Sequence, residues 1–254
     1  MRDRYIISNR LNEIGNIAHA FTTRFCGDIE DILENLTPPI PPLAKGAGHP
    51  SSGWVGGFGK VFTVKQVHGD SICVIDSPLT THHSSLQIEA DAIITNMKSL
   101  PIGVFTADCL PVILADVKGR AVGIVHAGRV GISLEISKKT VNKMKDLFDI
   151  KSQDIIAAIG PGISECCYEV DDSCINPFKE KFSYWKDIAI KKDDEKWMLD
   201  IKKANRMQLI EAGLKQETIF TTEFCTSCHN DRFFSYRREG KNAGRMLTFV
   251  AIKE

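Results

Sequence analysis

The sequence predicts an α/β protein whose strands form a layered, mixed β-sheet. Three observations support this prediction: a globular composition, a series of short apolar runs, and helical patterns placed between those runs. The chain has 254 residues, of which 43% are hydrophobic and 25% are charged, as is usual for globular proteins. The length suits one large domain or two small ones. Because strands and helices alternate, we expect a single domain over residues 1–254.

One long segment near the N-terminus differs from the rest in composition. Residues 37–59 read TPPIPPLAKGAGHPSSGWVGGFG. Proline donates no ladder hydrogen bond and glycine resists ordering, so this segment is predicted to be a loop. A loop of this length inside a domain is often functional. It leads directly into the first candidate motif, so it is either a rim or lid of a site or a plain connection.

Six short runs rich in apolar and β-branched residues are interpreted as strands. Each is bounded by Gly, Pro, Asp or Asn. Several are apolar almost throughout, which is typical of strands covered on both faces. In chain order the runs are VFTVKQV (61–67), SICVID (71–76), ADAIITN (90–96), IGVFTA (102–107), PVILADV (111–117) and AVGIVHA (121–127).

Two helices are expected in the second half of the chain. The first covers about residues 131–148, because its apolar residues repeat at helical spacing while its lysines lie mostly off that stripe. The second covers residues 201–212 and ends at Gly213. The apolar stripe of the first helix consists of Leu134, Val141, Met144 and Phe148.

Three further strands are expected after the first of these helices. DIIAAIGPG (154–162) is interpreted as a buried strand that ends in a turn. RFFSYRR (232–238) and RMLTFVAI (245–252) are interpreted as two closing strands.

Charge and patterning argue against several functional classes. Lys plus Arg number 32, as do Asp plus Glu, so the net charge is zero and nothing signals nucleic-acid binding. The N-terminus lacks the apolar core of a secretory signal. No apolar run reaches the roughly 18–20 residues needed to cross a bilayer. We therefore expect a cytoplasmic protein with no membrane partner, whose eight cysteines stay reduced.

Three segments end in side chains that bind metals. VKQVHGD, FTADCLP and IVHAGRVG each lead from a predicted strand into a polar or glycine turn, and they carry His68, Cys109 and His126. Two imidazoles and one thiolate form a three-ligand zinc set that leaves a fourth position for water or substrate. The spacing alone is weak support, because an isolated histidine at a strand end is more often an ordinary polar residue.

Five segments together resemble one family. QVHGD, TADCLPV, VHAG, IGPGISECCYEV and the region from CTSCHNDRFFSYRREG to NAGR follow one another in that family's order, over roughly residues 61–251. The chain resembles the YfiH or laccase-domain family, also called the polyphenol oxidase or peptidoglycan-editing-factor family.

The resemblance implies a fold, a metal and several activities. It implies an α/β/α layering and zinc bound through His68, Cys109 and His126. It implies phosphorolysis of adenosine, inosine, guanosine and methylthioadenosine, together with adenosine deamination. Relatives have also been assigned laccase-like copper oxidation and an amidase role in editing peptidoglycan precursors. A metal-dependent nucleoside-binding protein without catalysis is a further alternative.

The chain departs from the family pattern around the substrate rather than around the metal. TTRFCGD stands where TRxGG is usual, so Arg24 and Gly27 remain comparable. HAGRVG stands where HAGWRG is usual: the tryptophan is missing and Arg129 is displaced by one position. A recognisable SLNL segment is also missing. These changes put the pocket for phosphate and base in doubt.

Four further residues are candidates for roles with a nucleoside and phosphate. Arg24 is the first candidate for phosphate and Arg129 the second, because a guanidinium matches phosphate oxygens. Asp108 could be a general base, could orient a ligand, or could simply be a turn or cap carboxylate. Gln66 would share a strand face with His68 and so lie near the substrate. Whether the protein is a monomer or a homodimer stays open.

The remaining cysteines carry weaker signals. Cys225 and Cys228 belong to the string CTSCH, which matches the haem-attachment pattern, but haem attachment requires export. A structural metal at these two cysteines would lack two evident partners. Cys166 and Cys167 are interpreted as small buried apolar residues rather than a redox pair.

Overall fold

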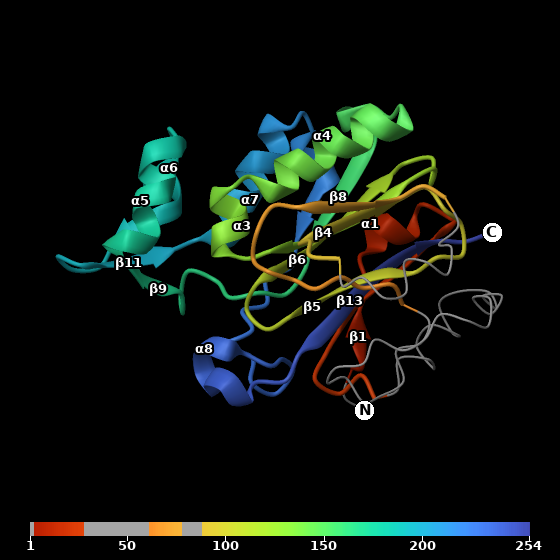
Figure 1. Ribbon diagram of the computed structural model, residues 1–254. Coiled ribbons are helices and arrows are strands. Elements are labelled where there is room, and N and C mark those ends of the chain that lie inside the picture. The colour runs from red at the N-terminus through yellow and green to blue at the C-terminus, as the bar shows by residue number, and fades with distance from the viewer. Residues whose placement is uncertain (1–2, 28–60, 78–87) are drawn as a thin grey trace.

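The computed structural model describes residues 3–27, 61–77 and 88–254 (Figure 1). The predicted loop over residues 37–59 lies outside the described residues. Within the described part, no helix is both long and apolar enough to span a membrane.

A six-stranded mixed sheet forms the centre of the molecule. Its strand order is β12-β8-β6-β7-β4-β3, with antiparallel pairs in the middle and parallel pairs at both ends. Successive residues of a strand point to opposite faces. Ile94 of β4 therefore belongs to one core and its neighbour Ile93 to the other. The prediction of an α/β fold built on a mixed sheet is confirmed.

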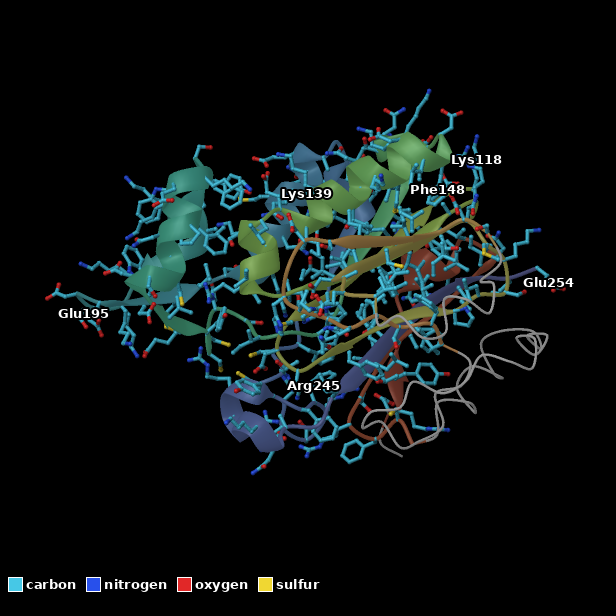
Figure 2. The ribbon with its side chains drawn as sticks, viewed as in Figure 1. Lys118, Lys139, Phe148, Glu195, Arg245 and Glu254 are labelled. Carbon is cyan, nitrogen blue, oxygen red and sulfur yellow. The ribbon has the colours of Figure 1, made fainter. Side chains whose placement is uncertain are left out.

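Helices cover one face of this sheet. α4 (Ile136–Phe148) and α7 (Ile201–Glu211) lie across it, above the sheet in the view of Figure 1. Val141 and Met144 of α4 are fully buried against the strands. Phe148 also packs on this core, while Lys139 pairs with Asp70 in the loop after His68. Figure 2 labels Phe148 and Lys139 on this helix.

A second sheet, rather than long helices, covers most of the opposite face. It has four strands in the order β1-β2-β13-β5, and β13 is paired along both of its sides. Phe21, Val104 and Val250 of this sheet pack against the central one, together with Leu11 of the short helix α1. The layers are therefore helix, sheet and sheet, with α1 as the helical part of the outer layer.

The predicted helix over 131–148 is divided in two. α3 (Arg129–Ser133) ends before Leu134, and α4 begins after Glu135. Glu135 has a positive φ of 63°, which interrupts the helical backbone. Its carboxylate accepts ion pairs from Lys138 and Lys181. Leu134 is 37% exposed and so does not join the buried stripe.

Two predicted strands are wrong. Residues 61–67 make only isolated bridges, Phe62 with Ile102 and Lys65 with Glu89. Residues 232–238 turn into helix α8, because the Ser235 side chain accepts the backbone N–H of Arg238 and caps the first turn. Residues 245–252 form the expected strand, and the helix over 201–212 is confirmed within one residue.

The remaining elements complete the fold. A small antiparallel sheet of order β10-β11-β9 stands with α5 and α6 to one side of the central sheet (Figure 1). The strands are β1 (Tyr5–Ile6), β2 (Ile17–Thr22), β3 (Ile72–Ile75), β4 (Ala92–Thr95), β5 (Ile102–Thr106), β6 (Leu110–Asp116), β7 (Val122–Ala127), β8 (Ile155–Ile159), β9 (Glu169–Asp171), β10 (Ala189–Lys191), β11 (Lys196–Leu199), β12 (Ile219–Thr221) and β13 (Met246–Ile252). The other helices are α1 (Asn9–Asn12), α5 (Asp172–Lys181), α6 (Trp185–Ile188) and α8 (Tyr236–Glu239), with short 3₁₀ turns η2 (Ser152–Asp154), η3 (Gln216–Thr218) and η4 (Gly240–Asn242).

Candidate metal centre

The three predicted ligands come together at one end of strands β6 and β7. Cys109 directly precedes β6, and His126 lies in β7 opposite Pro111 of β6. His68 lies in the loop before β3. One ligand atom from each of the three side chains lies within 4.8 Å of the others. This separation allows all three to bind a single ion.

Asp91 fixes the orientation of His126. Its Oδ1 lies 2.7 Å from Nδ1 of His126, so the other ring nitrogen, Nε2, is left for a metal. Asp91 is completely buried and His126 is 3% exposed. A carboxylate that holds a histidine in this way is the usual support of a zinc ligand.

The same carboxylate also holds the loop that carries His68. It accepts the backbone N–H groups of Val67 (3.2 Å), His68 (3.0 Å) and Gly69 (2.6 Å). Burial alone would raise the pKa of Asp91, but the hydrogen bonds from His126 and from the loop lower it. His68 has a φ of 60°, a conformation that these backbone bonds stabilise.

The electrostatics of the centre favour a thiolate. Burial would raise the pKa of Cys109, but hydrogen bonds from His126 and His68 and their charge lower it to about 6. Burial would lower the pKa of His126, whereas its bonds to Asp91 and Cys109 raise it to about 9. The protein therefore provides an ionised sulfur, which is the form that binds metals.

Gly128 allows the ligands to approach one another. A Cβ atom built on it would lie 3.0 Å from Sγ of Cys109 and 3.2 Å from Cδ2 of His68. Any larger residue here would push against two of the three ligands. The glycine after AVGIVHA is thus required by the closeness of the backbone to the centre.

Asp108 lies beside the centre, but both of its carboxylate oxygens are engaged. Oδ1 accepts the hydroxyl of Thr226 at 2.6 Å, and Oδ2 accepts the backbone N–H of Arg237 at 2.6 Å. These contacts match the alternative reading of Asp108 as a cap carboxylate, here at the start of α8. Its φ of 88° shows that the backbone also turns sharply at this point.

Gln66 holds a backbone segment in place. Its Nε2 donates to the carbonyl of Phe105 and its Oε1 accepts the N–H of the same residue, both at 2.8 Å. The expectation that Gln66 shares a strand face with His68 fails, because residues 61–67 do not form a strand. Its side chain instead ties this segment to β5.

The two candidate arginines have different surroundings. Arg24 donates to the carbonyl of Asn230 at 2.5 Å, lies 4.0 Å from Glu239 and stacks over the ring of Phe234. Arg129 follows Gly128 directly, and its side chain has no hydrogen bond or ion pair in the described part of the chain. Arg129 is therefore the one whose guanidinium is available.

Two residues near the centre had not been expected from the sequence. Asp91 is the more important; its only signal is an acidic residue at the edge of the apolar run ADAIITN. Tyr168 is the other. Burial raises its pKa, and the charges of Arg129 and Cys109 act on its hydroxyl in opposite directions. The guanidinium of Arg237 lies over its ring, with Cζ 5.3 Å from the ring centroid.

Cys166 and Cys167 are not buried apolar residues. Cys166 is exposed and Cys167 is half-buried, and both lie against Cys228. That interpretation of the pair was wrong. The loop after Pro161 brings them to the CTSC segment, which the sequence separates from them by about sixty residues.

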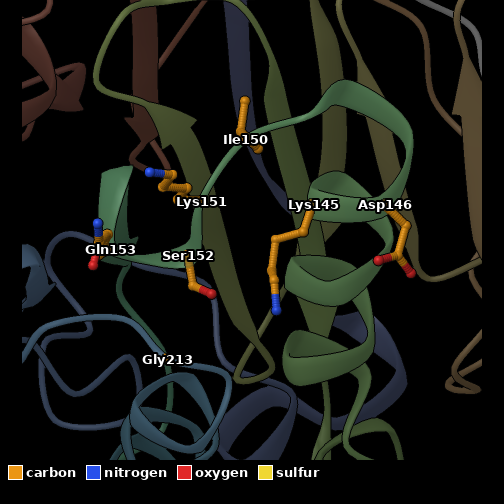
Figure 3. A pocket seen from close by; sticks show the side chains of 7 residues that line it. All are labelled: Lys145, Asp146, Ile150, Lys151, Ser152, Gln153 and Gly213. Carbon is orange, nitrogen blue, oxygen red and sulfur yellow. The ribbon is translucent and has the colours of Figure 1, made fainter.

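A surface hollow between the ends of α4 and α7 is unrelated to the centre. It has a volume of about 470 Å³ and shares no residue with the three ligands or their partners (Figure 3). Its lining consists of Lys145, Asp146, Ile150, Lys151, Ser152, Gln153 and Gly213.

Comparison with known proteins agrees with the geometry. Residues 54–253 match the family described as multi-copper polyphenol oxidoreductase laccase. The chain belongs to this family. A purine nucleoside phosphorylase of Clostridium acetobutylicum is 38% identical over 192 residues, covering 75% of this chain and 76% of that protein. An adenosine deaminase from an unknown prokaryotic organism is 34% identical over 194 residues, covering 74% of each.

Solved structures confirm the fold of this family member. The hypothetical protein YfiH of Bacillus licheniformis superimposes with a TM-score of 0.80 at 23% identity, covering 99% of this chain and all of that one. YlmD of Geobacillus stearothermophilus gives a TM-score of 0.78 at 23% identity over the whole of both chains.

Proposed function

We propose that this protein is a zinc-dependent purine nucleoside phosphorylase that acts on adenosine, inosine, guanosine and methylthioadenosine, with adenosine deamination as a second activity. The observation that carries the proposal is the convergence of His68, Cys109 and His126 on one point. The names of its relatives point to the same chemistry.

The donor set fits zinc. Two neutral imidazoles and a thiolate suit Zn²⁺, and three protein ligands leave one position open, as in catalytic zinc sites. When bound, zinc supplies a Lewis acid that polarises a substrate oxygen or lowers the pKa of water. Copper would also accept these donors. However, four-electron oxygen reduction needs several copper ions, and the described residues contain one histidine-bearing ligand group.

The chain offers residues for both halves of the substrate. We propose that Arg129 binds phosphate, because its guanidinium has no competing partner in the described part of the chain. Arg24 is the secondary candidate, since it already bonds Asn230 and approaches Glu239. Tyr168 offers an aromatic ring for the base where the family's tryptophan is missing. Asp108 and Gln66 are proposed to position the backbone around the pocket.

The reaction itself provides the test. Protein loaded with zinc and supplied with adenosine and phosphate should release adenine and ribose 1-phosphate, and inosine should form if deamination also occurs. Cys109→Ala should abolish the release of adenine and the formation of inosine. Cys26→Ala changes a cysteine outside the ligand group and should leave both reactions intact. Folded, zinc-loaded protein that releases neither adenine nor inosine would refute the proposal.

The same assay separates the other functions. Saturable adenosine binding without products would indicate a nucleoside-binding protein. Cleavage of an amide in a cell-wall precursor, with no phosphorolysis, would indicate the editing amidase. Arg129→Lys gives a finer test: it should raise the KM for phosphate more than that for adenosine, because lysine keeps the charge and loses the planar fork.

A further inference from the structure

Four cysteines from two distant segments meet at one point away from the three-ligand centre. They are Cys166 and Cys167, in the loop after β8, and Cys225 and Cys228, in the segment after β12. Sγ of Cys166 lies 3.8 Å from that of Cys167 and 3.5 Å from that of Cys228, and Sγ of Cys167 lies 3.3 Å from that of Cys228. All four sulfurs lie within 4.8 Å of one another.

These distances match one tetrahedral ion. A zinc ion bound by four thiolates at about 2.3 Å places its sulfurs about 3.8 Å apart. Clusters of two or four iron atoms divide the four thiolates among different irons, so thiolates on different irons lie farther apart than four sulfurs around one ion. A disulfide uses only two sulfurs and would leave the convergence of the other two unexplained.

The backbone around Cys225 resembles that of a metal-binding turn. Its sulfur accepts the N–H of Ser164 at 3.4 Å. A backbone N–H that donates to the sulfur stabilises a thiolate rather than a thiol. The spacing Cys-x-x-Cys is the usual ligand spacing of structural zinc sites.

One buried cation, Lys202, offsets part of the charge that four thiolates would bring, and Arg238 holds the backbone of the turn. Lys202 is 8% exposed, donates to the carbonyls of Thr222 and Phe224, and acts electrostatically on Cys225 and Cys166. Arg238 donates to the carbonyls of Thr226 and Ser227, inside the Cys-x-x-Cys turn, at 2.8 Å each. A buried lysine needs a nearby negative charge, and a zinc–tetrathiolate complex supplies one.

We infer that Cys166, Cys167, Cys225 and Cys228 bind one zinc ion, as a second and structural metal site with no open position. The site joins the loop that carries Tyr168 to the segment that carries Thr226. Thr226 in turn donates its hydroxyl to Asp108, the residue before the ligand Cys109. The four-cysteine site therefore anchors a segment that contacts the residue next to Cys109.

Metal counting on the full-length protein tests this inference without any activity assay. Reduced protein titrated with zinc should bind two equivalents per chain. Cys109→Ala should bind one equivalent, and Cys228→Ala should also bind one. Cys26→Ala, whose sulfur lies outside both groups, should bind two.

Cobalt(II) distinguishes the two sites by their ligands. The cobalt-loaded Cys109→Ala protein should keep the strong thiolate-to-metal absorption of a four-sulfur site, and Cys228→Ala should lose most of it. A single equivalent in the wild-type protein, lost with Cys109→Ala, would overturn the inference even if Cys228→Ala did not fold. Disulfides among the four cysteines would also overturn the inference. They would appear as an intact mass of the chain that is lower by two hydrogen atoms for each bonded pair.

Discussion

Asp91 is the residue on which the geometry of the three-ligand centre depends most. One buried carboxylate accepts the ring N–H of His126 and three backbone N–H groups of the loop at His68. It thus fixes two of the three ligands at once. A carboxamide in its place has one acceptor oxygen and would present an N–H₂ to some of these donors.

Asp91→Asn should therefore weaken zinc binding by about 10–100-fold, which is the range found when the support of a metal-binding histidine is lost. Competition with a chromophoric chelator measures the affinity. Asp70→Asn is the matched control, because it removes the same charge from a half-exposed residue that pairs with Lys139. Equal affinities in Asp91→Asn and the wild type would show that the carboxylate does not support the ligands.

Gly128 makes a steric prediction. Gly128→Ala places a methyl group 3.0 Å from Sγ of Cys109 and 3.2 Å from Cδ2 of His68, so the ligands must move apart. Zinc affinity should fall while thermal stability changes little. Gly15→Ala is the control, since a Cβ at Gly15 meets no atom within 4 Å. Unchanged affinity in Gly128→Ala would mean that the ligands have room to adjust.

His19 makes the folded protein sensitive to acid. It is 1% exposed; burial and the charge of Lys253 lower its pKa from 6.5 to about 4, against a hydrogen bond from Ser8 that raises it. Above pH 6.5 the histidine is neutral in the folded and unfolded states. Between pH 6.5 and 4 only the unfolded chain readily takes up the proton, so the free energy of unfolding falls, by up to about 3 kcal/mol.

Denaturant titrations from pH 7 to pH 4 measure this loss. His19→Gln keeps an acceptor for the N–H of Ser8 but does not titrate, so its free energy of unfolding should fall less over the same range. If the free energy of unfolding falls equally with pH in both proteins, the pKa of His19 is not lowered in the folded state.

At the scale of elements, the sequence predicts those strands that appear as apolar runs. It does not predict the elements whose conformation depends on a few individual contacts. β4, β5, β6 and β7 were recognisable because each is apolar on both faces and is buried on both. The segment 61–67 has strand-like composition but pairs with no complete strand. The segment 232–238 enters helix α8 through the local cap at Ser235 and through Asp108, which accepts the N–H of Arg237 from 129 residues away. Composition does not encode the second of these contacts.

The candidate site divides in the same way. The convergence of His68, Cys109 and His126 could be predicted, because two imidazoles and a thiol, each beside a glycine or polar turn, have a chemical signature. That they bind an ion stays a prediction. Asp91 was not, because its role depends on the pairing of β4 with β7. The partners of Cys225 and Cys228 were not either, since only folding brings them to Cys166 and Cys167.

Asp108 connects two elements, β6 and α8, and its role can be tested. Asp108→Asn leaves the hydroxyl of Thr226 or the N–H of Arg237 without its charged acceptor. The free energy of unfolding should fall by about 1–3 kcal/mol. If Asp108 acts only in this way, the pH profile of kcat should keep its shape. A general base makes kcat rise with pH as the base loses its proton. If Asp108→Asn is as stable as the wild type and this rise disappears, a catalytic role is favoured instead.

At the scale of the whole molecule, the two sheets share one core. The central sheet contacts helices on one side and the second sheet on the other, and β2 and β13 are the inner strands of that second sheet. We expect residues 1–254 to unfold as a single domain. Calorimetry should show one transition whose calorimetric and van't Hoff enthalpies agree. Two separable transitions would show that the two layers are independent units.

The candidate ligands and the residues that contact their neighbours come from different stretches of the chain. His68, Asp91, Cys109 and His126 all lie in the stretch from β3 to β7 and its preceding loop, whereas Thr226 and Arg237, which bond Asp108 beside Cys109, come from the later part. A substitution in the first stretch alters the candidate ligands or their support directly. A substitution in the later stretch reaches Cys109 only indirectly, through Asp108.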